Sequence, residues 1–135
     1  MQDLTKIQVR ELSNIKILDG TSVKQKNIDN YYLMKDVDAL ISDYSSAPND
    51  FLHADKPIAY CLDDMDDYKL GFIVEDPRTL MAGHLLYKTS DLRSFLIDIR
   101  NNRDLFKKER HELFNYIFDY HDGKSSERLI EYLKL

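Results

Sequence analysis

Apolar positions in the first half of the chain switch between short continuous runs and helical spacing. The runs cover residues 15–18, 37–43 and 58–62, and runs of this length suit strands that are covered on both faces in a parallel sheet. Between them, residues 27–36 and about 46–54 space their apolar side chains three and four positions apart, which predicts two amphipathic helices. This order predicts an α/β fold with a doubly wound, Rossmann-like parallel sheet, in which the order of the strands stays open.

Each expected helix buries a defined set of side chains. The helix at 27–36 follows a turn at 19–22 and places on the sheet Ile28, Tyr31, Tyr32 and the stem of Lys35. The helix at 46–54 buries Ala47, Phe51 and Ala54.

The second half of the chain is acidic and irregular at first and then helical. A helix that starts at Thr89–Asp91 shows an apolar face made of Leu92, Phe95, Leu96 and Ile99. A second face, ending at the break Asp122–Gly123, consists of Phe106, Leu113, Phe114, Ile117 and His121. A last helix, capped by Ser125 or Ser126, directs inward Leu129, Ile130 and Leu133. No repeat and no Pro/Gly/Ser-rich linker interrupts the chain, which predicts one domain over residues 1–135.

Composition and charge narrow the classes of function. With 135 residues, 43% hydrophobic and 32% charged, the chain has the make-up of an ordinary globular domain. The net charge of −5 argues against nucleic-acid binding, and the basic cluster Lys107, Lys108 and Arg110 is mixed with glutamates, as on a solvated helix face. No segment reaches transmembrane length and no secretory signal stands at the N-terminus, so we expect a cytoplasmic location.

Few residues have the spacing of a catalytic or metal site. Cys61 lies in an apolar run and is expected in the core, and the four histidines show no zinc-ligand spacing. Asp63 to Asp67 lack a calcium-loop pattern, so a solvated loop is the favoured reading, although a binding role for one aspartate stays open. His84, in an expected loop, is a weak candidate for acid–base chemistry. We therefore predict no metal, no cofactor and no assigned catalytic residue.

Two serines follow the strand expected at 37–43. Ser45 and Ser46 would stand at the carboxyl edge of the sheet and at a helix start, where hydroxyls either cap the helix or bind a phosphate. Pro48 removes one N–H, which leaves Ser46 and Ala47 as backbone donors. Neither common glycine-rich nucleotide loop occurs, and on the residues alone capping is the stronger reading.

The segment 40–60, L-I-S-D-Y-S-S-A-P-N-D-F-L-H-A-D-K-P-I-A-Y, closely resembles a family signature, L-I-T-D-Y-S-S-x-x-x-D-F-x-x-x-x-K-P-I. The signature belongs to the CDP-glycerol glycerophosphotransferases, the bacterial teichoic-acid polymerases and primases. Weaker matches follow in order at residues 64–68, 81–84 and 122–128, so the resemblance covers about residues 15–135. Two positions depart from the family pattern: Asn49 stands where an aromatic residue is more common, and His84 where a proline or small residue is more common.

The resemblance implies the C-terminal half of a GT-B fold, a Rossmann-like domain that binds CDP-glycerol or a similar nucleotide-linked donor. It implies a donor pocket lined by Asp43, Tyr44, Ser45 and Ser46, with both serines on the diphosphate and Asp50 near donor hydroxyls. The lipid-linked polymer acceptor and a histidine base would come from a part of the transferase that this chain lacks, since the family's K-x-H-P element is not found before Ile15. The whole protein would work at the inner face of the cell membrane.

Other readings stay open at this point. A glycosyltransferase of the same fold that uses a UDP or GDP sugar differs only in base recognition, which the sequence does not identify. A non-catalytic α/β binding module would bind no nucleotide. A receiver-like signalling domain would need an acidic pair, a phosphorylatable aspartate and a late lysine, and the chain does not supply that set.

Overall fold

The computed structural model describes residues 14, 15, 18, 23, 24 and 29–135, and contacts divide the chain into two compact units, residues 1–33 and 34–135. The strand expected at 15–18 and the turn expected at 19–22 rest on residues outside this described part. Helix α2 (Asn30–Asp36) agrees with the later portion of the helix expected at 27–36. Its Tyr31 and Tyr32 are about two-thirds exposed, so their expected burial is wrong.

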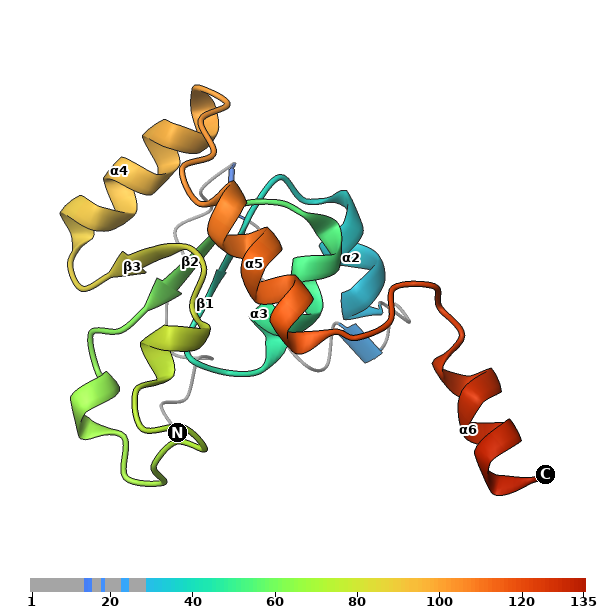
Figure 1. Ribbon diagram of the computed structural model, residues 1–135. Coiled ribbons are helices and arrows are strands. Elements are labelled where there is room, and N and C mark those ends of the chain that lie inside the picture. The colour runs from blue at the N-terminus through green and yellow to red at the C-terminus, as the bar shows by residue number, and fades with distance from the viewer. Residues whose placement is uncertain (1–13, 16–17, 19–22, 25–28) are drawn as a thin grey trace. The chain divides into compact units, whose positions relative to one another are not determined.

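Three parallel strands form the sheet of the unit at residues 34–135 (Figure 1). They are β1 (Leu40–Ser42), β2 (Ile58–Cys61) and β3 (His84–Leu86), in the order β1-β2-β3. Ser42 pairs with Tyr60, and Tyr60 pairs with Leu85 on the other side. The parallel α/β class predicted from the sequence is confirmed.

The outer strands differ from the prediction. Strand β1 is shorter than the run at 37–43, and Ile41 is 43% exposed, so β1 is not covered on both faces. Strand β3 was not predicted, because a run of three residues that begins with a histidine carries no strand periodicity. His84 therefore opens a strand, and its placement in a loop is wrong.

Strand β2 divides the core into two layers. Its side chains alternate between the faces of the sheet, as they do along any strand. Ile58 and Tyr60 pack into a cluster with Phe51, Leu52 and Leu113, which come from helix α3 (Ala47–Phe51), the 3-10 turn η2 (Leu52–Ala54) and helix α5 (Lys107–Ile117).

The opposite face is covered by helix α4 (Thr89–Arg100). Ala59 packs there with Leu86 and Phe95, and Leu92 and Ile99 lie against them. Helices on both faces of a parallel sheet make this unit Rossmann-like (Figure 1).

The predicted helix positions hold better than the predicted burial. Helix α4 begins at Thr89, where the Asp91 carboxylate accepts the N–H groups of Tyr87 and Lys88 at 3.1 and 3.2 Å, and Phe95 is buried as expected. Leu96 on the same helix is 52% exposed, which contradicts the prediction. Helix α5 ends at Ile117, so His121 lies beyond it.

Helix α6 (Ser125–Leu133) forms where predicted but buries nothing. Gly123, at φ +70°, makes the break, and Arg128 pairs with Asp122 at 3.0 Å across the helix start. The three side chains expected to point inward are more than half exposed: Leu129, Ile130 and Leu133. An amphipathic pattern identifies an apolar face, but it does not identify what covers that face.

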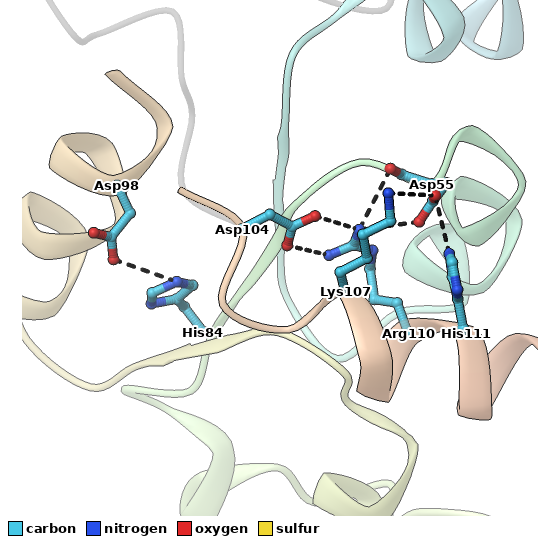
Figure 2. Close-up of polar contacts among 7 residues, drawn as sticks. All are labelled: Asp55, His84, Asp98, Asp104, Lys107, Arg110 and His111. Atoms are coloured by element: carbon cyan, nitrogen blue, oxygen red, sulfur yellow. Dashed lines mark hydrogen bonds and ion pairs between the residues drawn. The ribbon is translucent and has the colours of Figure 1, made fainter. Parts of the chain in front are cut away.

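Arg110 is buried, although the sequence placed it on a solvated face. Figure 2 shows its polar contacts. Its guanidinium donates two hydrogen bonds of 2.7 Å to the Asp104 carboxylate and two more, at 3.1 and 3.3 Å, to the side chain and backbone carbonyl of Asp55. Lys107 and His111 also approach Asp55, at 3.7 and 3.0 Å. Arg110 thereby joins helix α5 to the end of the turn η2.

Gly83 stands where the chain enters β3 beside β2. A Cβ atom at this position would lie 2.2 Å from the carbonyl oxygen of Ile58 and 3.1 Å from the ring of Tyr60. Real Cβ atoms do not approach a backbone oxygen so closely, so the pairing of β3 with β2 requires glycine here.

Asp104→Asn should destabilise the protein at neutral pH, by about 1–3 kcal/mol, since one partner of a buried guanidinium loses its charge. Hydrogen bonds from Arg110 hold the pKa of Asp104 below its ordinary value of 3.8. The contribution of the carboxylate is therefore complete above that value and is lost as the pH falls through the lowered pKa. Urea unfolding from pH 7 to acid should show the gap between variant and wild type narrowing below pH 3.8.

Glu112→Gln is the matched control. It removes the exposed pair with Lys108, whose atoms are 3.6 Å apart, and should change the free energy of unfolding by less than about 0.5 kcal/mol. Equal stability of Asp104→Asn and wild type at pH 7 would show that the Arg110 contacts do not hold α5.

Gly83→Ala should reduce stability by about 3 kcal/mol or more, because the new methyl group meets backbone that cannot move without disturbing β2. Gly71→Ala is the comparison: that position has φ +72° and nothing within 4 Å, so it carries only the cost of a left-handed residue, about 1–2 kcal/mol. Thermal unfolding measures both. A loss at Gly83 no larger than the loss at Gly71 would contradict the close approach.

Candidate functional site

The loop after β1 is a tight turn built on Asp43. The Asp43 carboxylate accepts the backbone N–H of Ser45 at 2.9 Å and the Ser42 hydroxyl at 3.4 Å. The hydroxyls of Ser42 and Ser45 lie 3.3 Å apart. Hydrogen bonding by Ser45 lowers the pKa of Asp43, so this carboxylate stays ionised at neutral pH. Asp43 and Ser45 thus fix the shape of the turn.

Ser46 occupies the position before helix α3 but does not cap it. Its backbone is helical, with φ −76° and ψ −12°, and its side chain makes no capping hydrogen bond. Its carbonyl accepts the N–H of Asn49 at 3.0 Å, and Pro48 is buried in the first turn. The capping role favoured for this serine on sequence grounds is therefore wrong. Ser46 is exposed, and in the first turn of the helix Pro48 has no N–H while the N–H of Asn49 bonds to the Ser46 carbonyl, which leaves Ala47 as the backbone donor of that turn.

The loop after β2 meets the loop after β1. The Tyr44 hydroxyl donates to the Asp64 carboxylate at 3.3 Å, and the Tyr44 ring lies 4.8 Å from that of Tyr68 and 5.3 Å from that of Phe72. Partial burial and the charge of Asp64 raise the pKa of Tyr44, so the phenol keeps its proton. Adjacent parallel strands bring these loops to one edge of the sheet.

A cavity of about 150 Å³ opens beside Ser45 and Ser46. Its walls come from the start of α3, from β2, and from the segment that runs through the 3-10 turn η4 (Pro77–Leu80). The lining residues are Tyr44, Ser45, Ser46, Pro48, Asn49, Tyr60, Phe72, Ile73, Val74, Pro77, Leu80 and Met81.

The sequence predicted only part of this lining. Tyr44, Ser45 and Ser46 were expected at a donor pocket and do line the cavity together, whereas Asp43 and Asp50 are not among the lining residues. Asp50 is exposed on α3, one turn after Ser46. The sequence analysis did not predict the wall at residues 72–81, because this segment has no helical or strand periodicity. Its position in the chain after the strand at 58–62 was the one signal that it could lie at the carboxyl edge of the sheet.

The other candidate residues lie apart from this cavity. His84 packs between the rings of Phe95 and Phe106, with its Nε2 atom 3.8 Å from the carboxylate of Asp98 (Figure 2). Asp98 also pairs with Arg103 at 2.6 Å. His84 therefore packs in the layer between β3 and α4 and takes no part in the cavity.

Cys61 and the aspartates of the 63–67 loop give no second site. Cys61 is half-buried, and burial raises the pKa of its thiol, so it is not an activated nucleophile. The loop forms the 3-10 turn η3 (Met65–Asp67) with its aspartates exposed. In the described part of the chain, no group of three or more potential ligands could hold a metal ion.

The described helices include none that is both long enough and apolar enough to span a membrane.

Comparison with known proteins identifies the chain at the level of its family. Searches of curated proteins and of solved structures gave no significant match. A family model described as CDP-Glycerol:Poly(glycerophosphate) glycerophosphotransferase matches residues 11–135, nearly the whole chain and all of the site described above. The resemblance stated from the sequence is thereby confirmed, and the chain belongs to the CDP-glycerol:poly(glycerophosphate) glycerophosphotransferase family.

Proposed function

We propose that this chain is the donor-binding part of a transferase that moves glycerol phosphate, or a similar polyol phosphate, from a CDP carrier onto teichoic acid or a related cell-envelope polymer. The observation that carries the proposal is that the side chain of Ser46 does not cap α3, although Ser46 lies at the carboxyl edge of the sheet and lines a cavity there. The chain also belongs to a family of such transferases. An exposed hydroxyl next in sequence to the free N–H groups of a helix start is of a kind that binds phosphate.

The residues of the turn have separate roles in this proposal. In this proposal the Ser46 hydroxyl and the backbone N–H groups of Ser46 and Ala47 bind the diphosphate, since Pro48 has no N–H and the N–H of Asn49 bonds to the Ser46 carbonyl. Asp43 fixes the turn through the N–H of Ser45, and Tyr44 forms a wall held by Asp64. Asp50, one turn along α3, would face hydroxyls of the donor.

The acceptor and the base are assigned to a facing domain of a GT-B arrangement. In-line phosphoryl transfer needs donor, acceptor and base held together. Among the residues that the structure describes, no histidine, lysine or arginine lines the cavity. We therefore expect this chain alone to bind the donor without turning it over, with the lipid-linked acceptor supplied at the inner face of the membrane in the whole protein.

Ser46→Ala should weaken the binding of both CDP and CDP-glycerol. A hydrogen bond to a charged group contributes roughly 1.5–3 kcal/mol, so the dissociation constant should rise about tenfold or more. Because Ser46 does not cap α3, the same change should leave the melting temperature of the free protein nearly unchanged, whereas loss of a true cap costs about 1 kcal/mol. Calorimetry for binding and thermal unfolding for stability separate the two roles.

Ser94→Ala is the control, since Ser94 is exposed on α4 and its hydroxyl donates to the Ser90 carbonyl at 3.1 Å, within its own helix. It should change neither ligand affinity. Equal binding heats for wild type and Ser46→Ala would exclude the proposed role of Ser46. Thermal shifts with CDP, UDP and GDP compare donors: a larger shift with UDP or GDP would favour a sugar transferase, and no shift with any nucleotide would favour a non-catalytic module.

A further inference from the structure

Helix α6 carries an apolar face that the rest of the described chain does not cover. Leu129, Ile130 and Leu133 are all more than half exposed, and the helix has no buried residue. Figure 1 shows α6 standing apart from the sheet and from helices α3, α4 and α5. A short helix has little stability of its own in water, and most helices are stabilised by packing of their apolar face. The apolar face of α6 is therefore suited to contact with another surface.

One flank of this face is held by the chain itself. The guanidinium of Arg128 donates two hydrogen bonds of 3.0 Å to the Asp122 carboxylate and lies 3.9 Å from the centre of the Tyr120 ring. The same carboxylate accepts the backbone N–H of Lys124, directly before the helix. The start of α6 is thus fixed on the turn at residues 120–124, and a partner meets a helix whose orientation to that turn is already set.

The opposite flank of the apolar face carries two charges of opposite sign. Glu127 lies in the first turn of α6, and Lys134 follows its last residue, Leu133. The two positions are about two helical turns apart, so they lie on the same side of the helix. Neither side chain forms an ion pair within the described part of the chain. This flank therefore presents a free negative charge near its start and a free positive charge near its end.

This order of charges is complementary to itself when two helices run antiparallel. A twofold axis places the first turn of one α6 beside the last turn of the other, so Glu127 of each copy meets Lys134 of the other copy. The midpoint between these positions falls beside Ile130, at the centre of the apolar face. The same arrangement places Leu129 of one copy against Leu133 of the other. Charge and apolar contact therefore agree on one register.

We propose that α6 is a self-association surface, on which the same helix of a second copy of this chain docks antiparallel. Contact among Leu129, Ile130 and Leu133 supplies the attraction, and the two pairs of Glu127 with Lys134 set the direction. Two helices of this length bury less than about 1,000 Å², an area in the range of weak, transient interfaces. The dimer should therefore form in a concentration-dependent way, and it does not depend on donor binding.

Sedimentation equilibrium of the full 135-residue chain, between about 10 µM and about 1 mM, measures this association. Glu127→Lys puts like charges at both ends of the helix pair and should raise the dissociation constant of the dimer about tenfold. Adding Lys134→Glu restores both pairs with exchanged charges and should return the constant to within about twofold of wild type. Because the exchanged charges oppose the helix dipole, this recovery would come from the pairing. Ile130→Gln should leave a monomer throughout the range.

Glu131→Lys is the matched control, because it makes the same change of charge on the side of α6 that points away from the apolar face. It should leave the dissociation constant within about twofold of wild type. An association that Glu127→Lys leaves unchanged, or that the double variant does not restore, would exclude antiparallel docking. A wild-type chain that stays monomeric would overturn the proposal: its binding to phosphatidylglycerol vesicles would assign the face to lipid, and no binding would assign it to another protein surface.

Discussion

Burial of β2 on both faces is the constraint on which the rest of the structure depends. Ile58 and Tyr60 need cover on one side and Ala59 on the other, and that requirement places α3 and α5 on one face and α4 on the opposite face. With β2 in the middle, the parallel pairing with β1 brings the loop at Asp43 beside the loop at Asp64. The candidate site is a consequence of how one central strand is buried.

Arg110 connects helix α5 to helix α3, whose first residues belong to the candidate site. Its hydrogen bonds hold Asp55, the residue that ends η2 with a left-handed backbone at φ 48°. The turn η2 follows directly after α3. The start of α3 carries Ser46. An arginine with 1% of its side chain exposed is costly to bury and is retained where its charge is matched. Here the two carboxylates that match it belong to chain segments about fifty residues apart, so the pair specifies how α5 docks.

Local sequence patterns predicted the positions of helices better than they predicted which side chains are buried. The signal for α4 was complete within residues 89–100: a carboxylate at the start and apolar spacing after it. The burial of Arg110 was not predictable, because the basic run around it is identical in composition to a solvated face and its partner Asp55 is distant in sequence. Likewise, β3 depends on the fit of Gly83 against Ile58, which no periodicity records. For the site, the motif located Ser45 and Ser46, but only the fold showed that Ser46 is not a cap.

The charges around the cavity bear on the proposed division of donor binding and transfer between this chain and the rest of the transferase. In the described part of the chain no lysine or arginine lines the cavity, and Asp43 and Asp64 stand nearby. Each of these carboxylates already accepts a hydrogen bond from the turn, which reduces but does not remove its repulsion of a diphosphate. Hydrogen-bond donors alone can orient such an anion. Neutralising its charge during transfer requires cations, and those would have to come from the facing side. In the proposed function, the residues of the turn would therefore orient the donor, while transfer would depend on cations supplied from elsewhere in the transferase.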